Sequence, residues 1–161
     1  ANEARWQALR EQRGSEKMAD LRSRMMTTME AGVGIYRSED RLLATCAELA
    51  ELKERYRHLD LRDGSRVFNT EWLYAIELGF LLDVAEVMAH SALQRKESRG
   101  SHQRLDTFNR RDDVNYLRHS LGLYRPGAAP EIAYQDVVIT RSRPAERLYG
   151  GAAEQAAQQA K

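Results

Sequence analysis

The residues best suited to chemistry form a short basic segment, residues 95–104, placed where a long apolar-striped helix is expected to end. The segment reads Arg-Lys-Glu-Ser-Arg-Gly-Ser-His-Gln-Arg, so five basic side chains surround one glycine. Ordinary helix ends carry one or two cations, which offset the negative end of the helix dipole. The density of positive charge in the basic segment therefore predicts a site for an anionic partner.

Acidic side chains interleave with the basic ones as far as residue 118, and this leaves a second interpretation open. The cations are Arg95, Lys96, Arg99, Arg104, Arg110, Arg111 and Arg118, and the anions are Glu97, Asp106, Asp112 and Asp113. An ion network that pairs with itself would explain the same pattern. Interleaved acids are typical of an interface that holds arginines in place for one specific ligand. They are less suited to a basic surface that binds along the phosphates of a nucleic acid. The formal net charge of +1 also argues against a nucleic-acid binder.

Other side chains that could bind a metal or act as a nucleophile give weaker signals. Glu86 and His90 lie four residues apart on one helix face and would supply half of a carboxylate–histidine metal site. The sequence has no second such pair, so we interpret them as a helix contact. Cys46, the single cysteine, occupies a core position where a thiol behaves as a small hydrophobe. The sequence also lacks nucleophile-elbow, phosphate-loop and dinucleotide fingerprints, so we expect no catalytic residue and no metal site.

Three segments with helical periodicity are expected to position the basic segment. With their predicted N-caps they are residues 15–32 with Ser15, 38–59 with Ser38, and 69–97 with Asn69 or Thr70. Long amphipathic helices joined by short links predict an antiparallel three-helix bundle over residues 1–106. No run approaches the roughly 18 to 20 apolar residues of a membrane span, so we expect no direct insertion into a membrane.

The pattern changes after residue 106, and residues 107–150 are expected to form a loop, a β-hairpin and a terminal motif packed on the bundle. Strands are predicted at 117–124 and 132–139, separated by a Pro- and Gly-containing turn at 125–130. Residues 151–161 are rich in Ala and Gln and are expected to be a disordered tail. The expected fold class is mainly α, with a three-helix bundle, a small hairpin and an extended tail.

Several motifs, in unbroken order along nearly the whole chain, resemble the C-terminal domain of the flavoprotein subunit of fumarate reductase and succinate dehydrogenase. Besides the basic segment they are residues 30–37, 49–56, 68–79, 85–92, 111–119 and 144–151. The resemblance implies a spectrin-like three-helix domain that packs on an FAD-binding domain and a capping domain. No motif of those two domains is present, so we expect them upstream of this chain, which begins without a methionine.

The resemblance also implies a function. The family interconverts fumarate and succinate at a flavin attached to a histidine, and electrons pass through an iron–sulfur subunit to or from quinone in membrane anchors. This chain would be a non-catalytic accessory domain that supports the flavin domain and subunit assembly at the cytoplasmic face of the bacterial inner membrane. FAD would be held by the missing domain, with no cofactor in this fragment. The amino-acid sequences of the basic segment and of the Gly-Gly tail resemble those of fumarate reductases more than those of succinate dehydrogenases.

Two arginines carry over from the family as residues near the flavin, Arg99 and Arg147. A guanidinium there would stabilise the negative charge that develops around the flavin N1 and C2 carbonyl. Gly100 would let the backbone turn closely after the helix, and His102 would orient the loop. A purely structural role, in which Arg99 only ties the loop to the bundle, remains an alternative.

Two other functions remain open from the sequence. One is a stand-alone helical interaction module that binds an acidic partner through residues 95–118. The other is the helical tail of L-aspartate oxidase, a related flavoprotein that works without quinone-linked partners. A dinucleotide fingerprint upstream of Ala1 would favour a flavoprotein over the stand-alone module.

Overall fold

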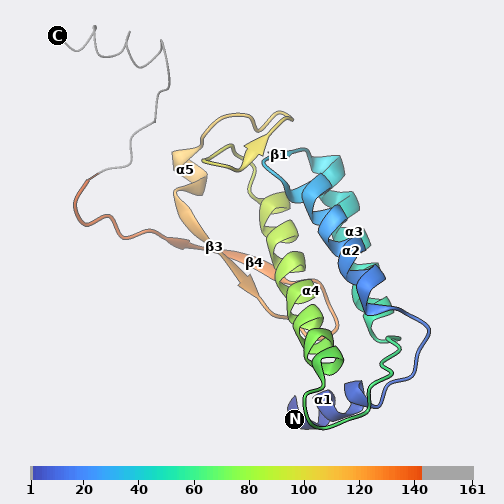
Figure 1. The fold of residues 1–161 in the computed structure, drawn as a ribbon. Coiled ribbons are helices and arrows are strands. Elements are labelled where there is room, and N and C mark those ends of the chain that lie inside the picture. The colour runs from blue at the N-terminus through green and yellow to red at the C-terminus, as the bar shows by residue number, and fades with distance from the viewer. Residues whose placement is uncertain (1, 143–161) are drawn as a thin grey trace, which may run out of the picture.

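A computed structural model of the protein describes residues 2–142. The helices are α1 (Asn2–Arg10), α2 (Met18–Val33), α3 (Glu39–Tyr56), α4 (Thr70–Gln94) and α5 (Asp113–Tyr116). The strands are β1 (Tyr36–Arg37), β2 (Gln103–Arg104), β3 (Arg118–Leu123) and β4 (Glu131–Asp136). The mainly helical fold class with a small hairpin, predicted from the sequence, is confirmed (Figure 1). The predicted tail at 151–161 lies outside the described residues.

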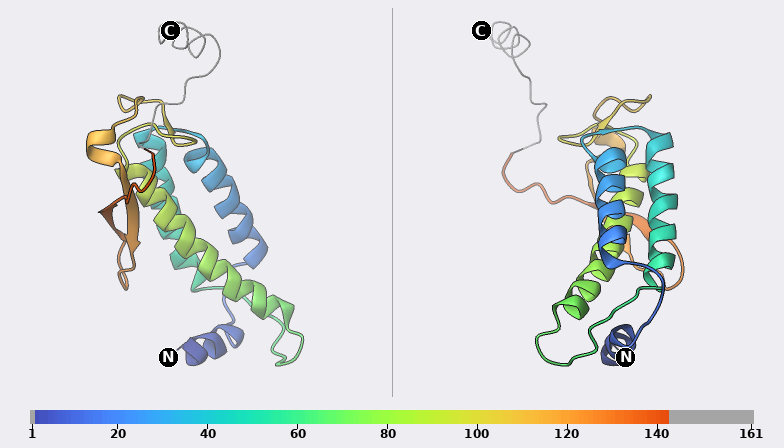
Figure 2. Two further views of the ribbon diagram at one scale, coloured as in Figure 1. Left: turned by 90° about the vertical axis from the view of Figure 1, so that its left-hand side faces the viewer. Right: turned by 45° about the vertical axis from the view of Figure 1, so that its right-hand side comes forward.

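The helices α2, α3 and α4 pack against one another, and those adjacent in the chain run in opposite directions (Figures 1 and 2). Each contributes leucines whose side chains are almost wholly removed from water: Leu21 of α2, Leu42, Leu49 and Leu52 of α3, and Leu78 and Leu82 of α4. Burying such a side chain stabilises the fold by about 1.5–3 kcal/mol. Buried alanines on α4, including Ala75 and Ala89, let the neighbouring helices approach closely.

The predicted helix ends need correction where the start of α2 meets the end of α3. We expected α2 to begin after a Ser15 cap and α3 to reach residue 59. Instead, the backbone N–H groups of Ser15 and Glu16 donate to the His58 carbonyl at 3.0 and 2.9 Å. This backbone pairing between two extended segments holds residues 14–16 and 58–60 outside both helices.

Only one of the predicted N-caps has the expected side-chain bond. The Asn69 side chain accepts a hydrogen bond from the Trp72 N–H at 2.7 Å, which satisfies a free donor of the first turn of α4. Ser38 occupies the N-cap of α3, but its hydroxyl donates to Asp40 instead. At the other end, α4 stops at Gln94 rather than residue 97: the next residue, Arg95, already has an extended backbone, and Glu97 beyond it is buried.

The short helix α1 was not predicted. It packs on the first turn of α4, where the Trp72 indole N–H donates to the Trp6 carbonyl at 2.8 Å. The Arg10 guanidinium lies 5.5 Å from the Trp72 ring, a cation–π distance. A helix of nine residues is too short to be stable alone, so tertiary packing fixes α1.

The strands β3 and β4 form an antiparallel hairpin beside α4, with Arg118 opposite Asp136 (Figure 1). The predicted second strand, 132–139, extends too far, because α5 precedes β3 and leaves no residue to pair beyond Asp136. Gly122 faces α4 so closely that a Cβ there would lie 2.4 Å from Val87 Cγ1. A second pairing, parallel β1 with β2, was not predicted and joins the basic segment to the α2–α3 link.

The core predicts a contrast between two leucines of α3. Leu49 is fully buried and Leu43 is 53% exposed. We expect Leu49→Ala to lower the free energy of unfolding by about 2–5 kcal/mol and Leu43→Ala by less than about 0.5 kcal/mol. Urea unfolding followed by circular dichroism checks both values. Equal losses in the two variants would contradict the assigned core.

Candidate functional site

The basic segment leaves α4 and folds back on the α2–α3 link. The N–H groups of Gln103 and Leu105 donate to the carbonyls of Ile35 and Arg37 at 3.0 and 2.8 Å. Just before Gln103, Arg99 and His102 exchange backbone hydrogen bonds at 2.9 and 3.0 Å, closing a tight turn. Gly100 has φ +58° inside this turn, in the left-handed region that glycine adopts without a steric penalty.

Glu97 lies at the centre of the basic segment with its side chain fully buried. One carboxylate oxygen accepts from Arg95 Nη1 and from Arg99 Nε, the latter at 2.8 Å. The other accepts from Arg99 Nη2 at 3.0 Å and from the Asp112 N–H at 2.9 Å. Burial alone would raise the pKa of Glu97, but these hydrogen bonds outweigh it and hold the pKa below its usual value.

Arg99 is shared between two carboxylates. In addition to its two bonds to Glu97, its Nη2 donates to Asp113 Oδ1 at 2.6 Å. Arg111 Nε donates to the same oxygen at 2.7 Å, and together these two guanidinium groups hold the pKa of Asp113 well below its usual range. The Arg99 side chain remains 28% exposed. Arg99 therefore both ties the turn to α5 and reaches the surface.

Arg104 caps the C-terminal end of α4. Its side chain is wholly buried, and Nη1 donates to the carbonyls of Ala92, Leu93 and Arg95 at 3.3–3.4 Å. Its Nε and Nη2 donate to Asp106 at 2.9 and 2.6 Å. This guanidinium satisfies carbonyls that have no partner inside the helix. The sequence grouped Arg104 with an anion site, and the structure corrects that interpretation, since no part of its side chain is accessible.

His102 joins the ends of α2 and α4. Its Nε2 lies 2.9 Å from the Arg95 carbonyl, and its Nδ1 lies 2.6 Å from Arg37 Nη1. A carbonyl only accepts, so Nε2 carries the proton and Nδ1 accepts from Arg37. Arg37 also donates to the carbonyls of Val33 and Gly34, at the end of α2. Burial, followed by the nearby charge of Arg37, lowers the pKa of His102 and keeps the ring neutral.

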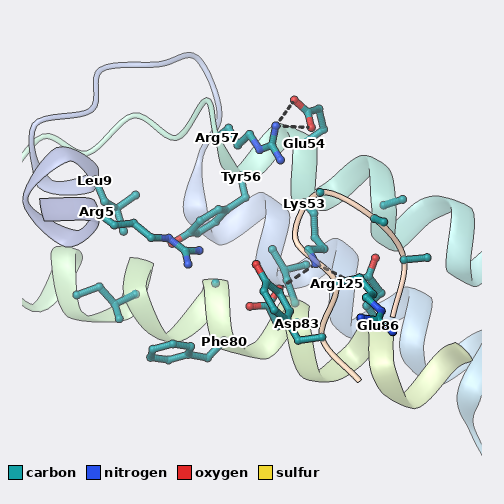
Figure 3. A pocket seen from close by; sticks show the side chains of 18 of the residues that line it. Arg5, Leu9, Lys53, Glu54, Tyr56, Arg57, Phe80, Asp83, Glu86 and Arg125 are labelled. Atoms are coloured by element: carbon teal, nitrogen blue, oxygen red, sulfur yellow. Dashed lines mark hydrogen bonds and ion pairs between the residues drawn. The ribbon is translucent and has the colours of Figure 1, made fainter. Parts of the chain in front are cut away.

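The weaker sequence candidates lie in and around a pocket of about 860 Å³ between α1, α3, α4 and the hairpin turn (Figure 3). Glu86 accepts from Lys53 Nζ at 2.6 Å, and Lys53 also contacts Asp83 at 2.9 Å, so these three charges pair with one another. Burial, followed by the Glu86 charge, raises the pKa of Cys46 to about 11, which keeps the thiol protonated. Within residues 2–142, no group of three His, Cys, Asp or Glu side chains is arranged to hold a metal.

Three further observations bear on the sequence predictions. Arg147 and the motif at 144–151 lie outside the described residues. The central role of Glu97 was missed, although an acid flanked by arginines two positions away on each side was a visible signal. In the described part of the chain, no helix combines the length and the apolar character needed to cross a bilayer.

The neutral state of His102 makes stability depend on pH. In the unfolded chain the His102 side chain has a pKa of about 6.5, and in the folded chain its pKa is lower, so the folded chain binds the proton less readily. The free energy of unfolding therefore falls as the pH drops below about 6.5. His102→Gln keeps one hydrogen-bond donor and one acceptor but does not titrate, so it should reduce the slope of the free energy of unfolding against pH. Urea unfolding from about pH 7.5 to about pH 5 measures it, with exposed His119→Gln as the control. Equal slopes in wild type and His102→Gln would contradict this assignment.

Comparisons with known proteins show to which family the chain belongs. A family model described as "Fumarate reductase flavoprotein C-term" matches residues 22–149. The fumarate reductase flavoprotein subunit of Proteus vulgaris is 56% identical over 146 residues, which covers 90% of this chain and 24% of that protein. The Rickettsia felis succinate dehydrogenase flavoprotein subunit is 32% identical over 152 residues, covering 90% and 25%.

A solved structure of Escherichia coli quinol fumarate reductase superposes with a TM-score of 0.87 at 49% identity, covering 92% of this chain and 26% of that chain. Mycobacterium smegmatis Sdh1 gives a TM-score of 0.65 at 32% identity, covering 78% and 21%. The chain thus spans about a quarter of the length of the curated relatives that it matches. On the extent of these matches, the chain belongs to the fumarate reductase flavoprotein C-terminal family.

Proposed function

We propose that this chain is the helical C-terminal part of an FAD-dependent flavoprotein subunit that interconverts fumarate and succinate. The chain itself is non-catalytic and supports the flavin domain. Its match to about a quarter of each relative supports this division of labour. Identity of 56% to a fumarate reductase subunit against 32% to a succinate dehydrogenase subunit favours the fumarate reductase type. It also favours this function over a stand-alone interaction module or the tail of L-aspartate oxidase.

The observation that carries the proposal is the outer face of α4. Its exposed apolar side chains, between 42% and 57% accessible, are Leu73, Tyr74, Phe80, Leu81, Val84 and Met88. Outward positions of α3 include the charged Glu51 and Glu54. Glu77 is the one charged side chain at an exposed position of α4. An outward helix face that is otherwise apolar marks an interaction surface. The remainder of the subunit, with its FAD-binding domain, is the partner that would bury this face.

The same helix leads into the basic segment, which supports a place for Arg99 beside the flavin. The exposed part of the Arg99 side chain fits a contact with the anionic edge of a flavin held by the neighbouring domain. FAD, when bound in the complete subunit, would supply the hydride chemistry. This chain would supply positive charge at the edge of the ring, through Arg99 and Arg147, with Gly100 and His102 shaping the turn.

The wider assembly follows from the same proposal. A second similar structure is described as quinol-fumarate reductase with menaquinol molecules, at 48% identity and a TM-score of 0.83. We infer an iron–sulfur subunit as the electron partner of the complete subunit, and membrane anchors as indirect partners. The subunit would lie at the cytoplasmic face of the bacterial inner membrane. Nucleic acid is not a partner in this proposal.

The docking role of α4 predicts a position-specific loss of association. The chain and the rest of the subunit, co-expressed as two polypeptides, should co-purify and bind. Phe80→Lys, at a site 55% exposed, should weaken binding at least about tenfold, because a charge would be buried in an apolar interface. Leu43→Lys on α3, at a site 53% exposed, is the matched control. Calorimetric titration gives the dissociation constants, and wild-type affinity in Phe80→Lys would refute docking through α4.

The place of Arg99 beside the flavin predicts a loss of cofactor. In the complete subunit, Arg99→Ala should lower covalent flavin content several-fold, because the negative charge at the ring edge would lose its counter-ion. Flavin absorbance of the denatured protein measures the content, and Arg22→Ala, at an exposed position of α2, serves as the control. Full flavin content in a normally folded Arg99→Ala subunit would rule out the contact.

A further inference from the structure

The arginines of the basic segment differ in how many of their donors are used. Arg104 bonds through Nε, Nη1 and Nη2 and is inaccessible. Arg95 also uses all three nitrogens: Nε reaches Ser120, Nη1 reaches Glu97 and the Tyr116 carbonyl, and Nη2 reaches the Arg118 carbonyl. Arg99 uses only Nε and Nη2. Among residues 2–142, no acceptor bonds its Nη1.

The free edge of Arg99 results from where its two carboxylates lie. Glu97 takes the edge formed by Nε and Nη2, and Asp113 takes the second N–H of Nη2. A guanidinium has five N–H donors in a rigid plane, so fixing one edge fixes the direction of the other two donors. The side chain is 28% exposed, and Nη1 therefore keeps two donors for an acceptor outside this part of the chain.

Glu97 is itself held rigidly. Its carboxylate is fully buried and bonded from the end of α4 by Arg95 and from the start of α5 by the Asp112 N–H. The Asp112 side chain in turn accepts from the N–H groups of Val114 and Asn115, both at 3.0 Å, and so anchors α5. A buried carboxylate is costly unless fully paired, so this arrangement specifies one geometry.

We propose that Glu97 is a positioning residue: it clamps Arg99 by one edge and aims the Nη1 edge at the anionic edge of the flavin. The inference rests on the proposed contact of Arg99 with the flavin. Asp113 assists as the second, surface-exposed clamp. Glu97 does not touch the flavin, and its effect passes through Arg99.

The direction in which Glu97→Gln shifts the midpoint potential of the flavin distinguishes a positioning role of Glu97 from an effect of its negative charge alone. If Glu97 acted only through its negative charge, Glu97→Gln would remove a repulsive charge and raise the midpoint potential of the flavin. If Glu97 positions Arg99, the same change releases the guanidinium, the anionic reduced flavin loses its partner, and the potential falls. The two accounts thus predict opposite directions.

The test is the midpoint potential of the bound flavin in the complete subunit, measured by spectroelectrochemistry. Arg99→Lys and Glu97→Gln should each lower it, by about 30 mV for a tenfold weaker preference for the reduced flavin. The double variant should fall no further than Arg99→Lys alone, because both changes remove one interaction. Glu48→Gln, which breaks the ion pair with Arg24 elsewhere on the bundle, should leave the potential unchanged.

Each contrary result has a separate meaning. An unchanged potential in Arg99→Lys would refute the flavin contact and hence the proposed role of Arg99. A shift in Arg99→Lys together with an unchanged or raised potential in folded Glu97→Gln would overturn the positioning role alone, as would additive shifts in the double variant. If Glu97→Gln does not fold, Asp113→Asn is the deciding variant. A fall in midpoint potential smaller than that of Arg99→Lys supports the positioning of Arg99 by its carboxylate partners, and an unchanged potential overturns it.

Discussion

The buried carboxylate of Glu97 is the interaction on which the geometry of the site depends. It joins the end of α4 through Arg95, the turn through Arg99, and the start of α5 through the Asp112 N–H. A charge in the interior is stable only with its partners in place, and removing one partner of such a pair costs about 3–5 kcal/mol. The three segments are therefore held in one arrangement, and the direction of Arg99 follows from it.

The ends of two helices are built into the same polar cluster. Arg37 satisfies carbonyls at the end of α2, Arg104 satisfies carbonyls at the end of α4, and His102 bonds to Arg37 and to the Arg95 carbonyl. Helix ends leave such carbonyls without partners, and burying them unpaired would be costly. Most cations of the basic segment thus have structural roles. Arg99 differs because one of its edges has no acceptor in the described part of the chain.

The sequence predicted the elements that have a strong local pattern. Apolar periodicity indicated α2, α3 and α4, and a turn between two β-rich stretches indicated the hairpin. What it could not predict depends on contacts between distant residues. The extended pairing of Glu16 with Leu59 shortens two helices, and α1 depends on packing against Trp72. No local pattern carries this information.

The same limit applies to the site. Arg95, Arg99 and Arg104 are alike in the sequence, and only the fold shows which carboxylate or carbonyl each one meets. The composition of the basic segment did indicate an ion network and an anionic partner, and the network is present. Within the described residues, telling Arg99, which keeps one guanidinium edge without an acceptor, from the two fully bonded arginines required the positions of Glu97 and Asp106.

A crystal structure of the complete subunit with FAD bound would test the central claim most directly, through the distance from Arg99 Nη1 to the flavin. We predict about 2.7–3.2 Å to the C2 carbonyl or N1 edge of the ring, with Nε and Nη2 still bonded to Glu97. An Arg99 side chain that faces solvent, or that contacts only protein groups while the flavin edge is met by other residues, would contradict it.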